Sequence, residues 1–124
     1  MKRRVVITGL GAISALGHDV AENWDACRAG RSGVGPITLF DPAAFEPRFA
    51  AEGKGFDPVK AFGPREARRM DRFTQFALAA AGQALAHSGL PITPENEWRT
   101  GVIVGSGVGG LQTTQDAAET LRAR

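Results

Sequence analysis

The sequence has little of several features that would point to a compartment or to a class of partner. It holds one cysteine, Cys27, among 124 residues, so an internal disulfide is impossible and nothing indicates an oxidising compartment. No apolar run approaches the ~18 residues that a transmembrane helix needs. The formal net charge is only +2, which does not by itself indicate a nucleic-acid or membrane partner. We therefore expect a cytoplasmic globular domain without either partner.

Two short apolar runs followed by glycine predict buried β-strands. Residues 5–8 form the first and residues 101–104 the second, and their continuous apolar character is typical of parallel strands covered on both faces. The basic start MKRR and the apolar run behind it resemble a secretory signal, but glycines interrupt the run and no A-x-A cleavage site follows. Two strands rarely make a stable α/β sheet alone, so we expect residues 1–124 to be the N-terminal piece of a longer protein.

Three segments favour helices. Asp19 can cap a first helix that stops at Gly30, with Cys27 on its apolar face, where we expect it to be buried. After an irregular stretch over residues 31–63, Pro64 is placed to open a long helix that ends at Gly89, with His87 near its end as a packed residue or a cation. Residues 73–85 of that helix are apolar nearly all round, which indicates burial in a larger body. The third helix follows residue 110.

Four arginines occupy one face of the expected long helix, at spacings of three, four and seven residues. Such a face is either solvated or a docking patch for an acidic or phosphorylated partner, because guanidinium groups suit carboxylates and phosphates. Aromatic residues are not interleaved with the arginines, so nucleic acid is the weaker candidate. The four are Arg65, Arg68, Arg69 and Arg72, and we call residues 65–72 the basic segment.

Residues 105–110, the glycine loop, read GSGVGG and match the G-x-G-x-x-G pattern of a dinucleotide-binding turn. An earlier pair, Gly9 and Gly11, precedes the first helix by too many residues to present a phosphate to its N-terminus. The glycine loop does run directly into a helix, so its spacing leaves a nucleotide site open. The alternative is that the glycines permit positive φ angles and close backbone packing.

Three segments in order, RRVVITGLGAISALG, REARRMDRFTQFALAAAGQAL and RTGVIVGSGVGGL, resemble the N-terminal part of the β-ketoacyl-acyl carrier protein synthases. The likeness is greatest to the elongating type II synthases of bacterial fatty-acid synthesis. It implies an α/β, thiolase-like fold with five layers (α-β-α-β-α), of which residues 1–124 supply the opening part of the first half. It also implies a homodimer that elongates acyl chains by decarboxylating Claisen condensation, with no metal and no cofactor.

The resemblance assigns roles to few residues of this chain. The family's cysteine nucleophile and two histidines stand in motifs that residues 1–124 lack, so we expect this piece to be inactive alone, and Cys27, His18 and His87 do not fill those roles. Arg65, Arg68 and Arg69 match positions that receive the acidic acyl carrier protein, and Arg72 extends that face. Val108 matches a position at the acyl pocket near the dimer interface, where side-chain bulk affects which chain lengths fit.

Three alternatives stay open on the sequence. A polyketide ketosynthase, or its chain-length-factor partner, shares the opening motifs. A dinucleotide-binding oxidoreductase domain would account for the glycine loop in a different way. A non-catalytic interaction module is disfavoured, because the alanine-rich helix would leave a large apolar patch exposed.

Overall fold

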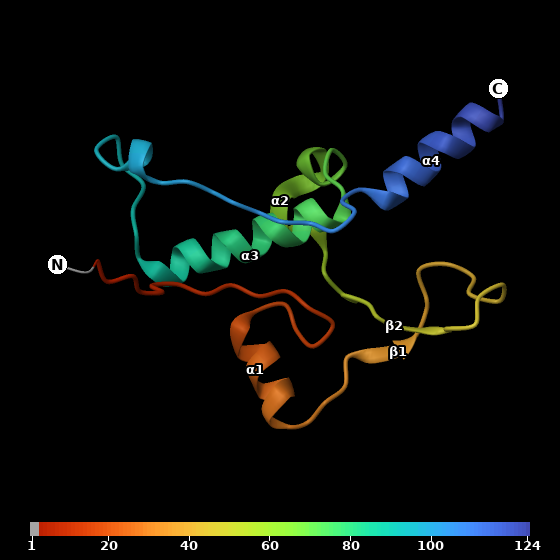
Figure 1. Cartoon of the computed structure of the whole chain (residues 1–124), viewed down its shortest axis with the longest axis horizontal. Helices are drawn as coiled ribbons and strands as arrows, with labels where there is room; N and C mark the ends of the chain where they lie inside the picture. Colours follow the sequence, from red (N-terminus) through yellow and green to blue (C-terminus); the bar gives the residue numbers. More distant parts are fainter. Residues whose placement is uncertain (1–2) are drawn as a thin grey trace. The chain divides into compact units, whose positions relative to one another are not determined.

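The computed structural model describes residues 3–124, which fold into four α-helices, one short 3-10 helix and two short strands (Figure 1). The chain divides into two compact units. The first runs up to Phe56 and includes Ala80–Ser88, and the second comprises Asp57–Ala79 and Gly89–Arg124. Helix α3 (Arg72–Ser88) contributes to both units.

The first helix has the ends that the sequence predicts. Helix α1 spans Val20–Arg28, and the Asp19 side chain accepts a hydrogen bond from the Glu22 amide at 2.8 Å. At the other end Gly30 has a φ of 65°. The amides of Gly30 and Arg31 donate to the carbonyls of Cys27 and Ala26 at 3.1 and 2.9 Å. These two bonds make a Schellman motif, which explains why a glycine stops the helix.

The buried face of α1 differs from the expected one. Cys27 is exposed and Trp24 is 63% exposed, whereas Ala26 is completely buried. Asn23 contributes to the attachment, because its side-chain amide donates to the carbonyls of Gly17 and Asp19 at 3.0 and 2.7 Å. The expectation of a buried Cys27 was wrong because a polar anchor and a small residue, rather than the apolar stripe, decide which side of α1 is covered.

The two apolar runs do not form the expected strands. Residues 5–8 and 101–104 have no strand assignment, and Ile7 and Ile103 are 82% and 100% exposed. The sheet found among residues 3–124 is instead a two-stranded antiparallel one, in which β1 (Val34–Pro36) pairs with β2 (Phe49–Ala51). A β-strand needs a neighbour that accepts its ladder hydrogen bonds, and within the described residues the apolar runs find none.

The Gly9–Gly11 region lies against the last turns of α3 within the first unit. A Cβ added at Gly11 would lie 2.8 Å from the Ala80 carbonyl carbon and 2.9 Å from the Ala84 nitrogen. The Ala12 amide donates to Gln83 Oε1 at 3.0 Å, and Gln83 Nε2 donates to the His18 carbonyl at 2.6 Å. The alternative interpretation of these first glycines, close backbone packing, is therefore confirmed.

The expected long helix from Pro64 is divided. Helix α2 (Pro58–Ala67) begins earlier, with the Asp57 side chain accepting from the Val59 and Lys60 amides. Gly63 is not helical, with φ of 80° and ψ of 162°, so a second helical piece opens at Pro64 as predicted, but it ends at Ala67 and α3 starts only at Arg72. Its end is as predicted, since Gly89 has φ of 63°.

The break between α2 and α3 is held by a buried glutamine. Gln75 is 7% exposed, and its Nε2 donates to the carbonyls of Ala67 and Met70 at 3.0 and 3.1 Å. These bonds satisfy the carbonyl of the last residue of α2, which has no helical partner, and a carbonyl of the turn that follows.

Large apolar side chains of α3 remain partly exposed among the described residues. Phe73, Leu78 and Leu85 are 38%, 47% and 46% exposed. The last helix, α4 (Leu111–Arg122), follows the 3-10 helix η1 (Glu97–Arg99) and has no buried residue. No helix among residues 3–124 has both the length and the apolar character that crossing a membrane requires.

Candidate functional site

The glycine loop joins an extended segment to α4 in the second unit. The Gly109 amide donates to Ser106 Oγ at 3.0 Å and the Leu111 amide donates to the Gly109 carbonyl at 3.0 Å. Gly109 has φ of 75°, a conformation that favours glycine. Val108 lies between these bonds and is 75% exposed. It is the one side chain of the loop with apolar bulk, and it faces open space.

Asp71, in the turn between α2 and α3, lies against the N-terminus of α4. Its Oδ1 accepts a hydrogen bond from Thr113 Oγ1. A Cβ added at Gly110 would overlap the same carboxylate. Thr113 is the third residue of α4 and Gly110 is its N-cap. Asp71 could not be found from the sequence, since forty-two positions separate it from Thr113 and no local pattern joins them.

The position of Asp71 argues against the dinucleotide interpretation of the glycine loop. In a dinucleotide turn the pyrophosphate lies at the helix N-terminus, where unpaired amides and the helix dipole favour negative charge. At α4 the carboxylate of Asp71 lies there instead. A phosphate at this place would meet a like charge and a side chain already in contact with Gly110.

The basic segment does not form one helical face. Arg65 lies in α2, Arg68 caps its C-terminus, Arg69 lies in the turn that follows, and Arg72 opens α3. All four are exposed. The expectation of a single stripe was wrong because α2 ends at Ala67 and α3 begins only at Arg72, which interrupts the helical repeat between the arginines.

Two of these arginines have partners within the second unit. Arg69 lies 3.9 Å from Glu66 in an exposed ion pair, with 66% of the arginine side chain accessible. The Arg72 guanidinium lies 4.4 Å from the centre of the Phe76 ring, a cation–π contact. An exposed pair of this kind contributes little to stability, so Arg69 can exchange Glu66 for an external carboxylate.

Glu52, in the first unit, is the most strongly perturbed acid among the described residues. It is 8% exposed and accepts from the Thr38 amide, the Thr38 hydroxyl and the Leu39 amide at 2.8, 2.7 and 3.1 Å. These bonds, the Thr38 amide first, lower the pKa of Glu52 to about 2, and Lys54 at 3.2 Å adds to the effect. The carboxylate ties the segment after β1 to the one after β2, which is a structural role.

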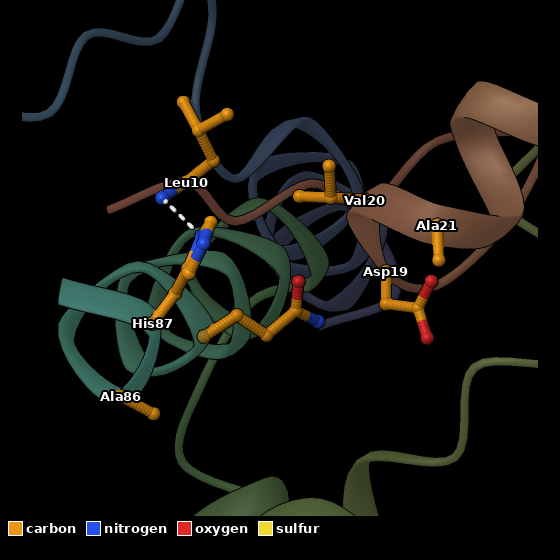
Figure 2. Close-up of a pocket in the computed structure, with 7 residues that line it drawn as sticks. Leu10, Asp19, Val20, Ala21, Ala86 and His87 are labelled. Carbon is orange, nitrogen blue, oxygen red and sulfur yellow. Dashed lines mark hydrogen bonds between the residues drawn. The ribbon is translucent and has the colours of Figure 1, made fainter. Parts of the chain in front are cut away.

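An open pocket of about 360 Å³ lies in the first unit between the start of α1 and the end of α3. Figure 2 shows the His87 ring reaching the Leu10 backbone, whose amide donates to His87 Nδ1 at 3.1 Å, while the Asp19 carboxylate points away from the ring. His87 is exposed at the end of α3, and this hydrogen bond joins its ring to the backbone of the N-terminal segment. The pocket holds no paired acid and base.

His18, the other histidine of the chain, contacts a backbone carbonyl and an aromatic ring of the first unit. His18 Nε2 contacts the Lys54 carbonyl at 2.7 Å, and its ring meets Phe56 edge-on. Among residues 3–124 no group of three His, Cys, Asp or Glu side chains is placed to hold a metal ion.

Comparisons with known proteins agree over nearly the whole chain. Residues 2–124 match the family model of the beta-ketoacyl synthase N-terminal domain. The chain is 50% identical over 110 residues to 3-oxoacyl-[acyl-carrier-protein] synthase 2 of Coxiella burnetii, covering 89% of this chain and 27% of that protein. With the synthase 2 of Vibrio cholerae it shares 45% over 120 residues, covering 97% and 29%.

A solved structure gives the same answer for the fold. The ishigamide ketosynthase/chain length factor superposes with a TM-score of 0.74 at 36% identity, over 98% of this chain and 30% of that one. Together with the family model, this likeness gives the fold as α/β and thiolase-like. The chain spans less than a third of the length of each of these relatives.

Proposed function

The chain belongs to the β-ketoacyl synthase family, as part of its N-terminal domain, and from this premise we propose that the protein is a 3-oxoacyl-acyl carrier protein synthase of fatty-acid elongation. The observation that carries the proposal is the 45–50% identity to synthases of that name over most of the chain. In the proposal, residues 1–124 open the first half of a five-layered thiolase-like fold that dimerises and works in the cytoplasm.

The proposed reaction has two stages. A cysteine thiolate attacks the acyl thioester, so that the acyl group moves to the enzyme and the carrier thiol leaves. Malonyl-acyl carrier protein then loses CO2, and the resulting carbanion attacks the enzyme thioester, forming the new carbon–carbon bond and releasing the cysteine. The cysteine and the two histidines that this requires are not among residues 1–124. Cys27 lies exposed on α1, and both histidines of the chain contact backbone groups.

This chain's own contribution is substrate recognition. We assign Val108 to the acyl pocket, which is supported by its position as the exposed apolar side chain of a loop whose ends are held by hydrogen bonds. An aliphatic side chain on a fixed loop sets how far an acyl chain can extend, because added bulk removes the space that the chain would fill. Valine leaves room for the longer substrates.

We assign the basic segment to carrier-protein docking. Its arginines are exposed on successive elements rather than on one face, so the cationic surface consists of the end of α2, the start of α3 and the turn between them. Arg65, Arg68 and Arg69 lie at the end of α2 or just after it, where a helix C-terminus favours cations. An acidic helix of a carrier protein supplies the complementary charge, and such complementarity mainly speeds encounter.

The test is a condensation assay on the intact protein. Acylated and malonylated acyl carrier proteins are supplied together, and the expected product is a 3-oxoacyl carrier protein two carbons longer than the starting acyl chain, with one CO2 released per turn. A protein that forms no such product but binds NAD or NADP in a titration overturns the proposal in favour of the dinucleotide-binding alternative.

A second candidate function follows from the ketosynthase/chain length factor neighbour. A polyketide ketosynthase would extend its product repeatedly and build a chain with several oxo groups. Mass spectrometry of the carrier-bound products separates the two functions. A single condensation that stops at one 3-oxo group supports fatty-acid elongation, and poly-oxo products support the polyketide function.

A further inference from the structure

We propose that Asp71 is a positioning residue for acyl-chain selection, which holds the glycine loop, and with it Val108, against the start of α3. The inference rests on the proposed function, since it assigns a further residue to the same acyl pocket. It is carried by the contact between Asp71 and the N-terminus of α4, which joins the basic segment to the glycine loop.

Asp71 stands on a fixed base. Its carbonyl accepts the Gln75 amide at 3.0 Å. The Gln75 side chain is buried and donates to the Ala67 and Met70 carbonyls on the other side of the turn. The backbone that carries Asp71 is therefore tied both to α3 and to the end of α2. The Asp71 carboxylate can therefore fix the position of the glycine loop, because its backbone is held and its side chain has only two rotatable bonds.

From this base the carboxylate reaches α4 in two places. Oδ1 accepts the Thr113 hydroxyl, and the Gly110 backbone lies so close that an added Cβ would overlap the carboxylate. Beside them, the Phe73 ring carbons lie 3.7 Å from the position of a Cβ on Gly109. The end of the glycine loop is thus seated between Asp71 and the first turn of α3.

Val108 takes its position from these contacts. It precedes Gly109, whose amide is bound to Ser106, and three quarters of its own surface is exposed. Its own packing therefore gives little restraint within the described residues. The contacts of Gly109 with Phe73 and of Gly110 with Asp71 decide where the Val108 side chain lies. A small displacement of a recognition side chain changes which substrates fit. Loss of the Asp71 contacts should therefore alter the chain-length preference more than the rate of the condensation itself.

The central variant is Thr113→Val, which removes the hydroxyl but keeps the size and the β-branching of the side chain. We expect the ratio of kcat/KM for long over short acyl chains to change by about two- to tenfold, the range that one hydrogen bond contributes. Thr113→Ser, which keeps the hydroxyl, should restore the parent ratio. Gly110→Ala should shift the ratio in the same direction as Thr113→Val, because the added methyl group displaces the carboxylate.

The matched control is Asp116→Asn. Asp116 is an exposed carboxylate on the same helix, whose Oδ1 accepts from Gln112 Nε2 within α4 at 2.8 Å. This variant should leave the chain-length ratio and the KM for malonyl-acyl carrier protein unchanged. Melting temperatures of all four variants in the intact protein show whether each is folded.

The outcomes separate this inference from the proposed function. An unchanged ratio in folded Thr113→Val overturns it, and so does an equal loss of kcat/KM for every chain length, which would mean that Asp71 only stabilises the fold. Both results would leave the proposed function standing. If the parent protein itself forms no 3-oxoacyl product, the proposed function fails and the inference fails with it.

Discussion

Substitution of Gly11 by alanine should destabilise the first unit, because the added methyl group has no space. Its position lies 2.8 Å from the Ala80 carbonyl carbon and 2.9 Å from the Ala84 nitrogen, and both are backbone atoms of α3 that cannot turn away as a side chain would. The segment around Gly11 must therefore move off the helix. That movement also breaks the 3.0 Å bond from the Ala12 amide to Gln83 Oε1.

The magnitude follows from these two losses. Overpacking of a closely packed site costs about 1–3 kcal/mol, and one lost hydrogen bond adds about 1 kcal/mol. We expect the free energy of unfolding of Gly11→Ala to fall by roughly 2–4 kcal/mol. The matched control is Gly82→Ala on α3, where an added Cβ meets nothing within 4 Å. It should raise the free energy of unfolding by about 0.5–1 kcal/mol, because alanine is the better helix former.

Urea unfolding of the intact protein, followed by circular dichroism, measures both variants. Equal unfolding midpoints for Gly11→Ala and Gly82→Ala would refute the packing argument. The experiment also bears on the dinucleotide interpretation, because a glycine that served only to approach a phosphate would leave the stability of the unliganded protein unchanged when replaced by alanine.

Variants at Glu52, at Val108 and in the basic segment test the other sites. The pKa of Glu52 is lowered from 4.5 to about 2, so its contribution to stability is complete above pH 4.5 and disappears as the pH falls toward 2. In Glu52→Gln the urea midpoint should therefore depend less on pH over that range than in the parent protein. The exposed Glu46→Gln is the control. Val108→Phe should lower kcat/KM for the longest accepted acyl chain at least about tenfold relative to the shortest, whereas Val108→Ala should not, since only added bulk obstructs the acyl pocket. Equal ratios of kcat/KM in the two variants would show that Val108 does not line the pocket. Replacement of both Arg68 and Arg69 by glutamate should raise the KM for acyl carrier protein roughly tenfold at low salt and much less at about 0.5 M NaCl, because screening weakens exposed charge pairs. An equal rise in KM for Arg28→Glu, on α1, would show that the effect is not specific to the basic segment.

The ends of the helices could be predicted from the sequence because they depend on neighbouring residues. Asp19 caps α1 and Gly30 and Gly89 follow α1 and α3 as expected, each through bonds or φ angles set within a few positions. The helical character after the glycine loop was also correctly predicted. The division between α2 and α3 was missed, since it depends on the Gln75 side chain folding back to carbonyls five and eight positions earlier.

The strands and the contacts between distant segments could not be predicted from local patterns. Residues 5–8 and 101–104 have the composition of buried strands, but a strand is completed by the neighbour that pairs with it, and composition does not name that neighbour. Glu52 gave no signal either, because its partners Thr38 and Leu39 reach it only through the pairing of β1 with β2. The family resemblance supplied the fold class where these patterns could not.

The glycine loop shows why a motif and a helix start together do not make a phosphate site. Its match to G-x-G-x-x-G is complete, and α4 begins directly after it, as a dinucleotide turn requires. What differs is the anion at the helix N-terminus. Asp71 satisfies from within the chain the preference for negative charge that would otherwise recruit a ligand. Gly110 allows a carboxylate to approach the backbone closely, and Gly109 allows a positive φ. The same glycines are thus required for a different reason. A loop fixed by its own protein in this way is suited to present a side chain, and the side chain that it presents is Val108.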